Sequence, residues 1–277
     1  MSHSDKNIEV FRDTVRLCET HERLKTSVLK STLSQKLIRE ADVIPVPTIC
    51  PSDSSTRITV SEKRTFEAAR SYRGTRTAVL NFANPWEPGG GVERGADAQE
   101  ECLCRCSGLF LNLKAMEDSF YLPHKKAFSP LANDDLIYTP EVLVFKTDAW
   151  VPKLLPESEW YAVDVITCAA PVLAKGFFKG SLSNEELFGI HERRLGRILD
   201  AAMAEHVESI VLGAFGCGAF CNDPNVVANA FKHVLARCGH AFKNIEFAIY
   251  SSDYEMKNYE IFRSVLGSLP QKNTAIN

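Results

Sequence analysis

The sequence alternates apolar runs with helical patterns, and this order restricts the fold more than any other feature of the chain. The apolar runs are residues 77–82, 161–168, 209–215 and 244–250. They are rich in β-branched and aliphatic side chains, which favours buried strands. The last three are separated by helical patterns, and strand–helix–strand order predicts a wound α/β sheet.

The N-terminal part of the chain predicts helices. Apolar side chains such as Phe11 and Leu24 recur at helical spacing through residues 7–40, with charged residues between them. We interpret residues 1–40 as a helical extension packed on a main domain of residues 41–277.

Two other segments predict less regular strands. Pro45 and Pro47 alternate within an apolar run of residues 42–60, which restricts it to an edge strand or an extended segment. Farther along, LIYTP and VLVFK read as two strands joined by residues 138–141.

Charge and cysteine usage restrict the partners and the compartment. Lysine and arginine number 32 against 35 acidic residues, so the formal net charge is −3. This argues against bulk electrostatic binding of nucleic acid, and a phosphate-bearing ligand would need a local site. The nine cysteines are irregularly spaced, and the chain begins without an apolar leader. We expect reduced thiols, a cytoplasmic location and no membrane contact.

Three closely spaced thiols, Cys102, Cys104 and Cys106, invite a metal interpretation. Residues two apart on a helix point about 200° apart, so these thiols would not converge on one ion. Structural zinc usually has paired Cys-x-x-Cys ligands, which are missing here. We expect these three cysteines to pack as small apolar side chains and to bind no metal.

Residues 81–101 join an apolar run to a helical pattern and carry the strongest chemical signal. They contain a glycine triplet followed by two adjacent carboxylates: Gly89, Gly90, Gly91, Glu100 and Glu101. Glycine adopts φ > 0 and lets the backbone approach a bulky ligand. A flexible wall beside carboxylates suits cleavage of a sugar linkage. The alternative is a pair of solvated acids that complement the helix dipole.

A second glycine-rich segment, residues 213–224, reads GAFGCGAFCNDP and lies between a predicted strand and a predicted helix. Ligands of open α/β sheets bind at such carboxyl ends of strands. Exposed N–H groups and the following helix N-terminus favour phosphate. The glycines alone are equally consistent with a tight turn.

The two segments together give the chain a resemblance to a known family. The glycine triplet, seven further residues and then Gln99-Glu100-Glu101 resemble the signature of poly(ADP-ribose) glycohydrolases of the smaller microbial type. Residues 213–224 resemble the diphosphate loop of macrodomains. The resemblance implies a three-layer α/β/α sandwich with a mixed central sheet. It also implies poly(ADP-ribose) or ADP-ribosylated protein as substrate, ADP-ribose as product, and a monomer without cofactor or metal.

By the same resemblance, Glu101 is the general acid and base that cleaves the α(1″→2′) ribose–ribose bond. Glu100 fixes a ribose hydroxyl, and Gln99 positions the loop or the ribose. Asn84 ends the motif Asn-Phe-Ala-Asn and presents its side chain to the terminal ribose, which is compatible with an Asx turn before Pro85.

The resemblance also implies roles for the second segment. Its backbone would donate to the diphosphate from Gly216, Cys217, Gly218 and Ala219. Phe220 would lie against the terminal ribose, although a strand-end phenylalanine is as often a core residue.

Three other functions compete with this one. A hydrolase of mono-ADP-ribosylated protein or nucleic acid would use the same fold and ligand. A binding-only macrodomain would not need two carboxylates beside the glycine triplet. A generic nucleotide-binding domain would carry a Walker pattern or a G-x-G-x-x-G fingerprint, which the sequence lacks.

Overall fold

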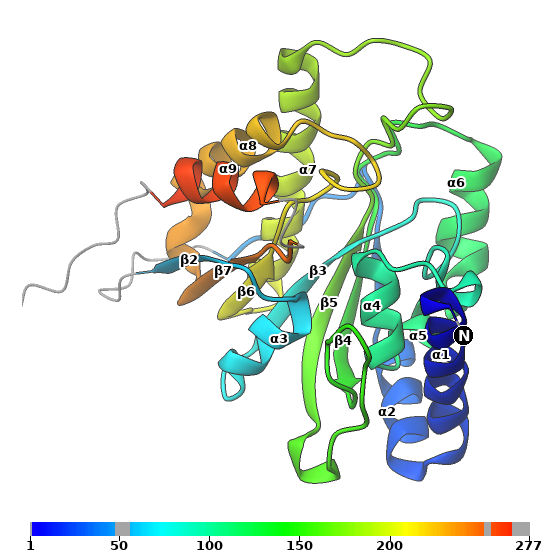
Figure 1. Ribbon diagram of the computed structural model, residues 1–277. Coiled ribbons are helices and arrows are strands. Elements are labelled where there is room, and N and C mark those ends of the chain that lie inside the picture. The colour runs from blue at the N-terminus through cyan, green and yellow to red at the C-terminus, as the bar shows by residue number, and fades with distance from the viewer. Residues whose placement is uncertain (1, 48–55, 252–255, 268–277) are drawn as a thin grey trace, which may run out of the picture.

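A mixed β-sheet forms the centre of the protein (Figure 1). The computed structural model describes residues 2–47, 56–251 and 256–267. Within them, seven strands are hydrogen-bonded in the order β1-β4-β5-β3-β6-β7-β2. The strands are β1 (Lys36–Ile38), β2 (Arg57–Ser61), β3 (Thr77–Phe82), β4 (Leu136–Val144), β5 (Tyr161–Cys168), β6 (Ser209–Leu212) and β7 (Asn244–Ala248).

The strands from β5 to β2 run parallel to one another, whereas β4 and β1 are antiparallel additions at one side. The last residues of β3 and β5 are in register, with Phe82 opposite Cys168. The loops that follow these strands therefore begin side by side. This is the edge of a parallel sheet at which ligands bind.

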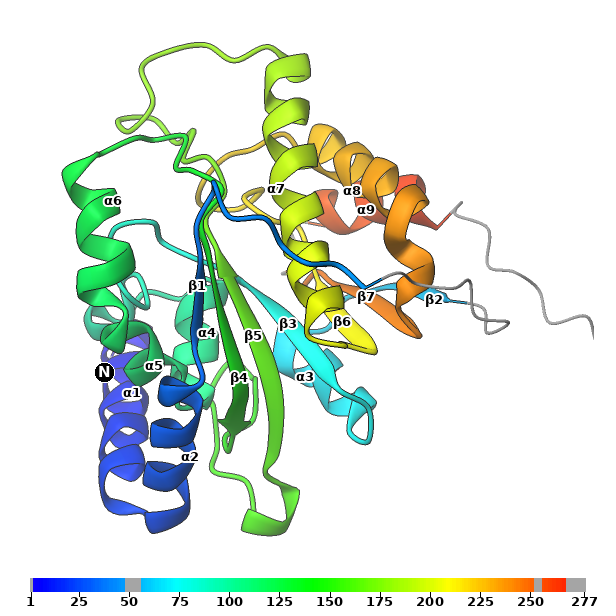
Figure 2. The same ribbon diagram turned by 180° about the vertical axis from the view of Figure 1, so that it is seen from behind.

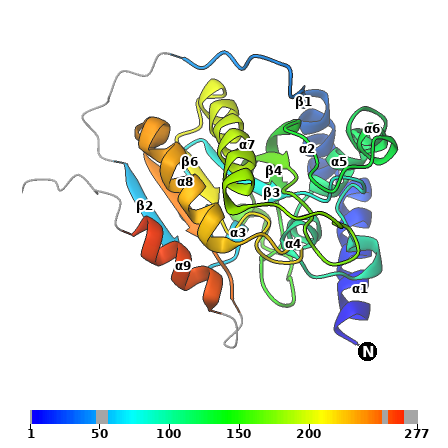
Figure 3. The same ribbon diagram turned by 90° about the horizontal axis from the view of Figure 1, so that it is seen from above.

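Helices cover both faces of the sheet, as the front, back and top views show (Figures 1, 2 and 3). Helices α7, α8 and α9 cover one face, and α1, α3, α4 and α5 cover the other. The helices are α1 (His3–Thr20), α2 (Glu22–Leu33), α3 (Thr65–Ala69), α4 (Gln99–Cys106), α5 (Leu109–Ala115), α6 (Leu122–Lys126), α7 (Asn184–Ala204), α8 (Pro224–Cys238) and α9 (Lys257–Leu266). This confirms the three-layer α/β/α sandwich.

Each central strand supplies both cores, which explains its continuous apolar sequence. In β3, Ala78 and Leu80 point into the core beneath α7 and α8, while Val79 points into the core beneath α4 and α5. In β5, Ile166 and Val165 divide in the same way. All five side chains have 0% exposure. Both faces of these strands are therefore apolar, and their sequences do not alternate between apolar and polar residues.

Two expectations about regular structure are wrong. Residues 36–38 were expected to be helical, but they form β1 and pair antiparallel with β4. Backbone pairing at the open edge of β4 outweighs the local helical pattern there. LIYTP and VLVFK form one strand, β4, rather than two, because the chain passes through a bulge between Thr139 and Val142. Glu141 takes φ 53° in that bulge.

The N-terminal helices pack against the loop that carries the predicted chemistry. Phe11 of α1 belongs to the core beneath α4 and α5. The side chain of Asn7 donates to the carbonyl of Gly95 at 3.2 Å, and Ser4 Oγ donates to the carbonyl of Arg94 at 3.0 Å. Helix α1 therefore supports the β3–α4 loop from outside, and the division at residue 40 remains a prediction.

The segment around Pro45 and Pro47 is partly visible. Residues 42–47 form no strand, residues 48–55 lie outside the described residues, and β2 is the edge strand that follows. Among the described helices, none has the length and apolar character needed to cross a membrane.

Candidate functional site

The glycine triplet and the catalytic carboxyl predicted from sequence lie in direct contact. The N–H of Gly91 donates to Glu101 Oε1 at 2.8 Å. Gly90 has φ 60°, and a Cβ there would lie 2.5 Å from the same oxygen. Within the described residues, Glu101 Oε2 is buried and has no hydrogen-bond partner. The carboxyl is thus fixed through one oxygen and leaves the other uncommitted.

Glu100 is buried beside the end of β3. Its Oε2 accepts from the backbone N–H of Asn84 at 2.7 Å, and its Oε1 accepts from the side chain of Asn81 at 3.2 Å. Burial raises the pKa of Glu100 to about 8, with a further upward contribution from Glu101, while these hydrogen bonds lower it. Burial therefore favours the protonated form of Glu100.

Gln99 links the first turn of α4 to the end of β3. Its Oε1 accepts from the N–H of Phe82 at 2.9 Å, and its Nε2 donates to the carbonyl of Leu80 at 2.8 Å and to Thr65 Oγ1 at 3.0 Å. These contacts use the side-chain amide within the protein. Of the two roles expected for Gln99, the geometry favours positioning the loop.

The side chain of Asn84 forms the expected Asx turn. Its Oδ1 accepts from the N–H groups of Trp86 and Glu87 at 2.8 and 3.0 Å. Its amide group has no acceptor in the described part of the chain, so it is the part of Asn84 that is left for a ligand.

A cavity of about 510 Å³ lies beside the carboxyl ends of the central strands. The predicted site residues that line it are Gly216, Gly218, Ala219, Phe220 and Gln99. Glu100, Glu101, Asn84 and the glycine triplet are not among its lining residues. They form an adjoining cluster, which Gln99 and Phe82 join to the cavity.

The glycine-rich loop after β6 offers free N–H groups. Those of Gly216, Gly218, Ala219 and Phe220 have no acceptor among the described residues. The N–H of Cys217 differs from the expectation, because it closes a turn on the carbonyl of Ala214 at 3.0 Å. Cys217 does not line the cavity, and burial raises the pKa of its thiol.

A buried side chain that the sequence did not single out holds this loop in shape. Asn222 Nδ2 donates to the carbonyls of Pro171, Gly216 and Phe220 at 2.7, 3.0 and 3.3 Å. Its Oδ1 lies 2.8 Å from His191 Nε2. Asn222 stands inside the glycine-rich motif, where it reads as a helix cap, although Asp223 is the residue that caps α8.

Burial lowers the pKa of His191 to about 4, with the hydrogen bond to Asn222 opposing this and Arg194 adding to it. The imidazole is therefore neutral at neutral pH. Its position in α7, within a long helical pattern, gave no sign of this role.

Residues from three distant segments form another part of the cavity wall. The Arg64 guanidinium lies 3.9 Å from the centre of the Tyr250 ring and donates to Cys102 Sγ at 3.3 Å. Asp148 also lines the cavity; one oxygen accepts from the N–H of Phe66, and burial raises its pKa. Sequence reasoning missed this wall because its residues are far apart in the chain.

The closely spaced thiols are enclosed in the core. Cys102, Cys104 and Cys106 are buried, and burial raises the pKa of each thiol. No group of three His, Cys, Asp or Glu side chains suited to a metal ion occurs in the part of the chain that the structure describes.

Comparison with known proteins shows which family the chain resembles. Residues 11–147 match the family model of the microbial-type PARG (poly(ADP-ribose) glycohydrolase) catalytic domain. No curated protein sequence matches the chain.

Several solved structures are similar over nearly the whole chain. Poly(ADP-ribose) glycohydrolase from Thermomonospora curvata is 31% identical with a TM-score of 0.83, and the match covers 94% of this chain and 98% of that one. The same enzyme bound to the inhibitor ADP-HPD is 32% identical with a TM-score of 0.80, covering 93% and 98%. The Deinococcus radiodurans enzyme in complex with ADP-ribose is 30% identical with a TM-score of 0.75, covering 87% and 97%. The fold, the paired carboxylates beside the glycine triplet and these matches agree, and the chain belongs to the poly(ADP-ribose) glycohydrolase family.

Proposed function

We propose that the protein is a poly(ADP-ribose) glycohydrolase that hydrolyses the α(1″→2′) ribose–ribose bond and releases ADP-ribose. The observation that carries the proposal is the contact between Gly91 and Glu101, which leaves one buried carboxyl oxygen without a partner. Solved relatives of this chain bind ADP-ribose and the inhibitor ADP-HPD. Membership of the family supports the same activity.

The cavity accommodates the ADP-ribose unit. A volume of about 510 Å³ lies in the range of sites for ligands of this size. The free N–H groups of the glycine-rich loop and the N-terminus of α8 hold the diphosphate. The wall with Arg64 and Tyr250 offers a flat surface for the adenine. Phe220 lies against the terminal ribose, which reaches toward the carboxylates.

Glu101 performs the proton transfers. As general acid it protonates the 2′ oxygen of the leaving ribose while the C1″–O bond breaks through an oxocarbenium-like transition state. As general base it takes a proton from the water that adds to C1″, which restores its protonated form. The bound diphosphate stabilises the positive charge at C1″. Glu100, oriented by Asn81 and Asn84, fixes the ribose hydroxyls.

Of two related functions, one fits the site less well and the other differs in its products. A binding-only macrodomain would gain nothing from the buried, unpartnered oxygen of Glu101, which costs roughly 1–3 kcal/mol to maintain. A hydrolase of mono-ADP-ribosylated protein would use the same cavity, and the products distinguish it from a polymer hydrolase.

Incubation with purified poly(ADP-ribose) tests the proposal. We expect free ADP-ribose to accumulate and the polymer to shorten on a sequencing gel. A protein automodified with single ADP-ribose units, incubated in parallel, should keep its label. Tight ADP-ribose binding without release from the polymer would establish a binding module instead.

A further inference from the structure

Three aromatic side chains from separate loops stack together near the glycine triplet. The Trp86 indole lies 4.9 Å from the Phe128 ring and 5.6 Å from the Phe177 ring, at interplanar angles of 23° and 11°. Phe128 is 54% exposed and Phe177 48% exposed, so the stack presents open phenyl surfaces to solvent. We call Trp86, Phe128 and Phe177 the aromatic stack. None of its members lines the cavity.

The aromatic stack is joined to both halves of the site. Trp86 belongs to the same loop as the glycine triplet, and its backbone N–H donates to the side chain of Asn84. On the other side, the β5–α7 loop that carries Phe177 also binds the glycine-rich loop, through the N–H of Leu173 and the carbonyl of Phe220 at 2.9 Å. The stack therefore flanks the ribose end of the site. The three loops lie at the same end of the sheet (Figures 1 and 2).

The two segments that bear the phenyl rings, α6 with the loop after it and the β5–α7 loop, carry positive charge. Residues 122–133 and 172–183 contain lysines but no aspartate or glutamate. The lysines are Lys125, Lys126, Lys175 and Lys179, and all are exposed. None forms an ion pair within the described part of the chain, whereas six other lysines do. A protein of net charge −3 thus has a local basic surface beside open aromatic rings.

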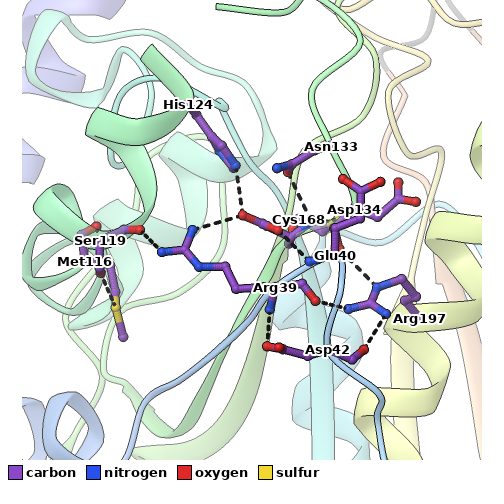
Figure 4. A network of polar contacts seen from close by, with 11 residues as sticks. Arg39, Glu40, Asp42, Met116, Ser119, His124, Asn133, Asp134, Cys168 and Arg197 are labelled. Carbon is purple, nitrogen blue, oxygen red and sulfur yellow. Dashed lines mark hydrogen bonds and ion pairs between the residues drawn. The ribbon is translucent and has the colours of Figure 1, made fainter. Parts of the chain in front are cut away.

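Polar contacts anchor the loop with Phe128 at both ends, and Figure 4 shows those made by Arg39 and His124. His124 Nε2 lies 3.3 Å from Asp135 Oδ2, and Arg39 donates to the same oxygen at 3.1 Å. Arg39 also donates to the carbonyl of Ser119 at 2.7 Å. These contacts tie α6 to the start of β4, so residues 125–128 sit on a fixed base. A ligand that binds there loses little free energy to ordering of the loop, because the loop is already held in place.

The chemistry of the substrate brings a second purine to this place. In an α(1″→2′) linkage the leaving oxygen is the 2′ oxygen of an adenosine ribose, so an adenine is attached to the very ribose that leaves. The geometry points to a subsite at which the aromatic stack binds the adenine of this leaving ADP-ribose unit, while the lysines bind its diphosphate. Base–aromatic stacking and backbone-tracking lysines are the usual means of holding a single-stranded nucleotide polymer. The subsite rests on the proposed function and extends it from one ADP-ribose unit to the polymer.

Ligand affinities measured with the Glu101→Gln protein test the subsite. We expect this variant not to hydrolyse the ligands, so their Kd values can be measured at equilibrium. ADP-ribose fills the cavity alone, whereas di-ADP-ribose reaches the subsite as well. We expect Phe128→Ala with Phe177→Ala to weaken di-ADP-ribose binding about tenfold and to change the Kd of ADP-ribose less than twofold. Lys175→Gln with Lys179→Gln should flatten the dependence of the di-ADP-ribose Kd on salt. Lys25→Gln with Lys232→Gln, lysines elsewhere on the surface, should change neither.

The outcomes separate this inference from the proposed function. Equal losses for both ligands, or no loss for either, would overturn the subsite and leave the glycohydrolase intact. Failure of the Glu101→Gln parent to bind either ligand would refute both. If the phenylalanine variants weaken binding of single-stranded oligo(dA) but not of di-ADP-ribose, the surface is a nucleic-acid site and the subsite is wrong.

Discussion

The carboxyl of Glu101 is held by the backbone N–H of Gly91 at 2.8 Å through Oε1, while its Oε2 is buried without a partner among the described residues. Leaving a buried polar atom unpaired costs roughly 1–3 kcal/mol. A general acid uses this arrangement well, because the fixed oxygen sets the orientation and the other remains free to exchange a proton. The neighbouring residue must be glycine, since a Cβ at Gly90 would lie only 2.5 Å from Glu101 Oε1.

Replacing Glu101 by glutamine should abolish hydrolysis and preserve ligand binding. The amide is isosteric but does not transfer protons, and a general acid contributes about 10²–10⁴-fold. Release of ADP-ribose from polymer measures the first effect, and calorimetric titration with ADP-ribose measures the second. Glu93→Gln, at an exposed acid of the same loop, is the matched control and should retain full activity. Near-normal turnover by Glu101→Gln would show that another group supplies the proton.

Gly90→Ala should cause a large loss of turnover and a modest loss in the free energy of unfolding. The added Cβ would lie 2.5 Å from Glu101 Oε1, at a backbone with φ 60°, so the carboxyl must move. A displacement of about 1 Å can cost 10²-fold in rate. Left-handed backbone in alanine adds roughly 1–2 kcal/mol of strain. Steady-state kinetics and urea unfolding measure the two effects.

Gly189→Ala is the control for that substitution. Gly189 lies within α7, and a Cβ there meets no atom within 4 Å. Activity should be unchanged, with a gain of about 0.5–1 kcal/mol in the free energy of unfolding. A Gly90→Ala variant that matched this control would exclude the close approach as the reason for the glycine.

The free energy of unfolding should depend on pH through Glu100. Its pKa is about 8 in the folded protein and 4.5 in the reference state, so between these values the folded state binds the extra proton. Stability from this group is complete below pH 4.5 and is lost as pH rises toward 8, by at most about 1.4 kcal/mol per pH unit. Glu100→Gln cannot ionise and should flatten the curve. Urea unfolding of both proteins from pH 5 to 8, with Glu93→Gln as control, measures the difference; parallel curves would contradict a buried, protonated Glu100.

Asn222→Ala should weaken ADP-ribose binding by changing the shape of the glycine-rich loop after β6. The side chain holds the carbonyls of Pro171, Gly216 and Phe220 together, and its loss leaves the buried carbonyl of Pro171 without a partner among the described residues. We expect a Kd at least about tenfold higher and a loss of about 1–3 kcal/mol in stability. Asn229→Ala is the control, because that asparagine also donates to a carbonyl but is exposed on α8. An unchanged Kd would mean that the loop keeps its shape without the clamp.

Local patterns predicted much of the fold. β3 spans Thr77–Phe82 and β5 spans Tyr161–Cys168, the apolar runs that the sequence marks. These features depend on side chains within a few residues of one another. β1 was missed because three residues become a strand only when the edge of β4 is available for pairing. The bulge at Glu141 likewise depends on the partner strand.

The candidate site divides in the same way. The sequence by itself determined which residues follow β3 and β6, because the glycines, carboxylates and asparagines of both loops are local motifs. Only the tertiary structure decided that Glu100 is buried with a raised pKa, that Asn222 and His191 clamp the second loop, and that Trp86 stacks between loops far apart in the chain. Burial, pKa and long-range contact depend on what the whole fold places around a side chain, and no stretch of neighbouring residues contains that information.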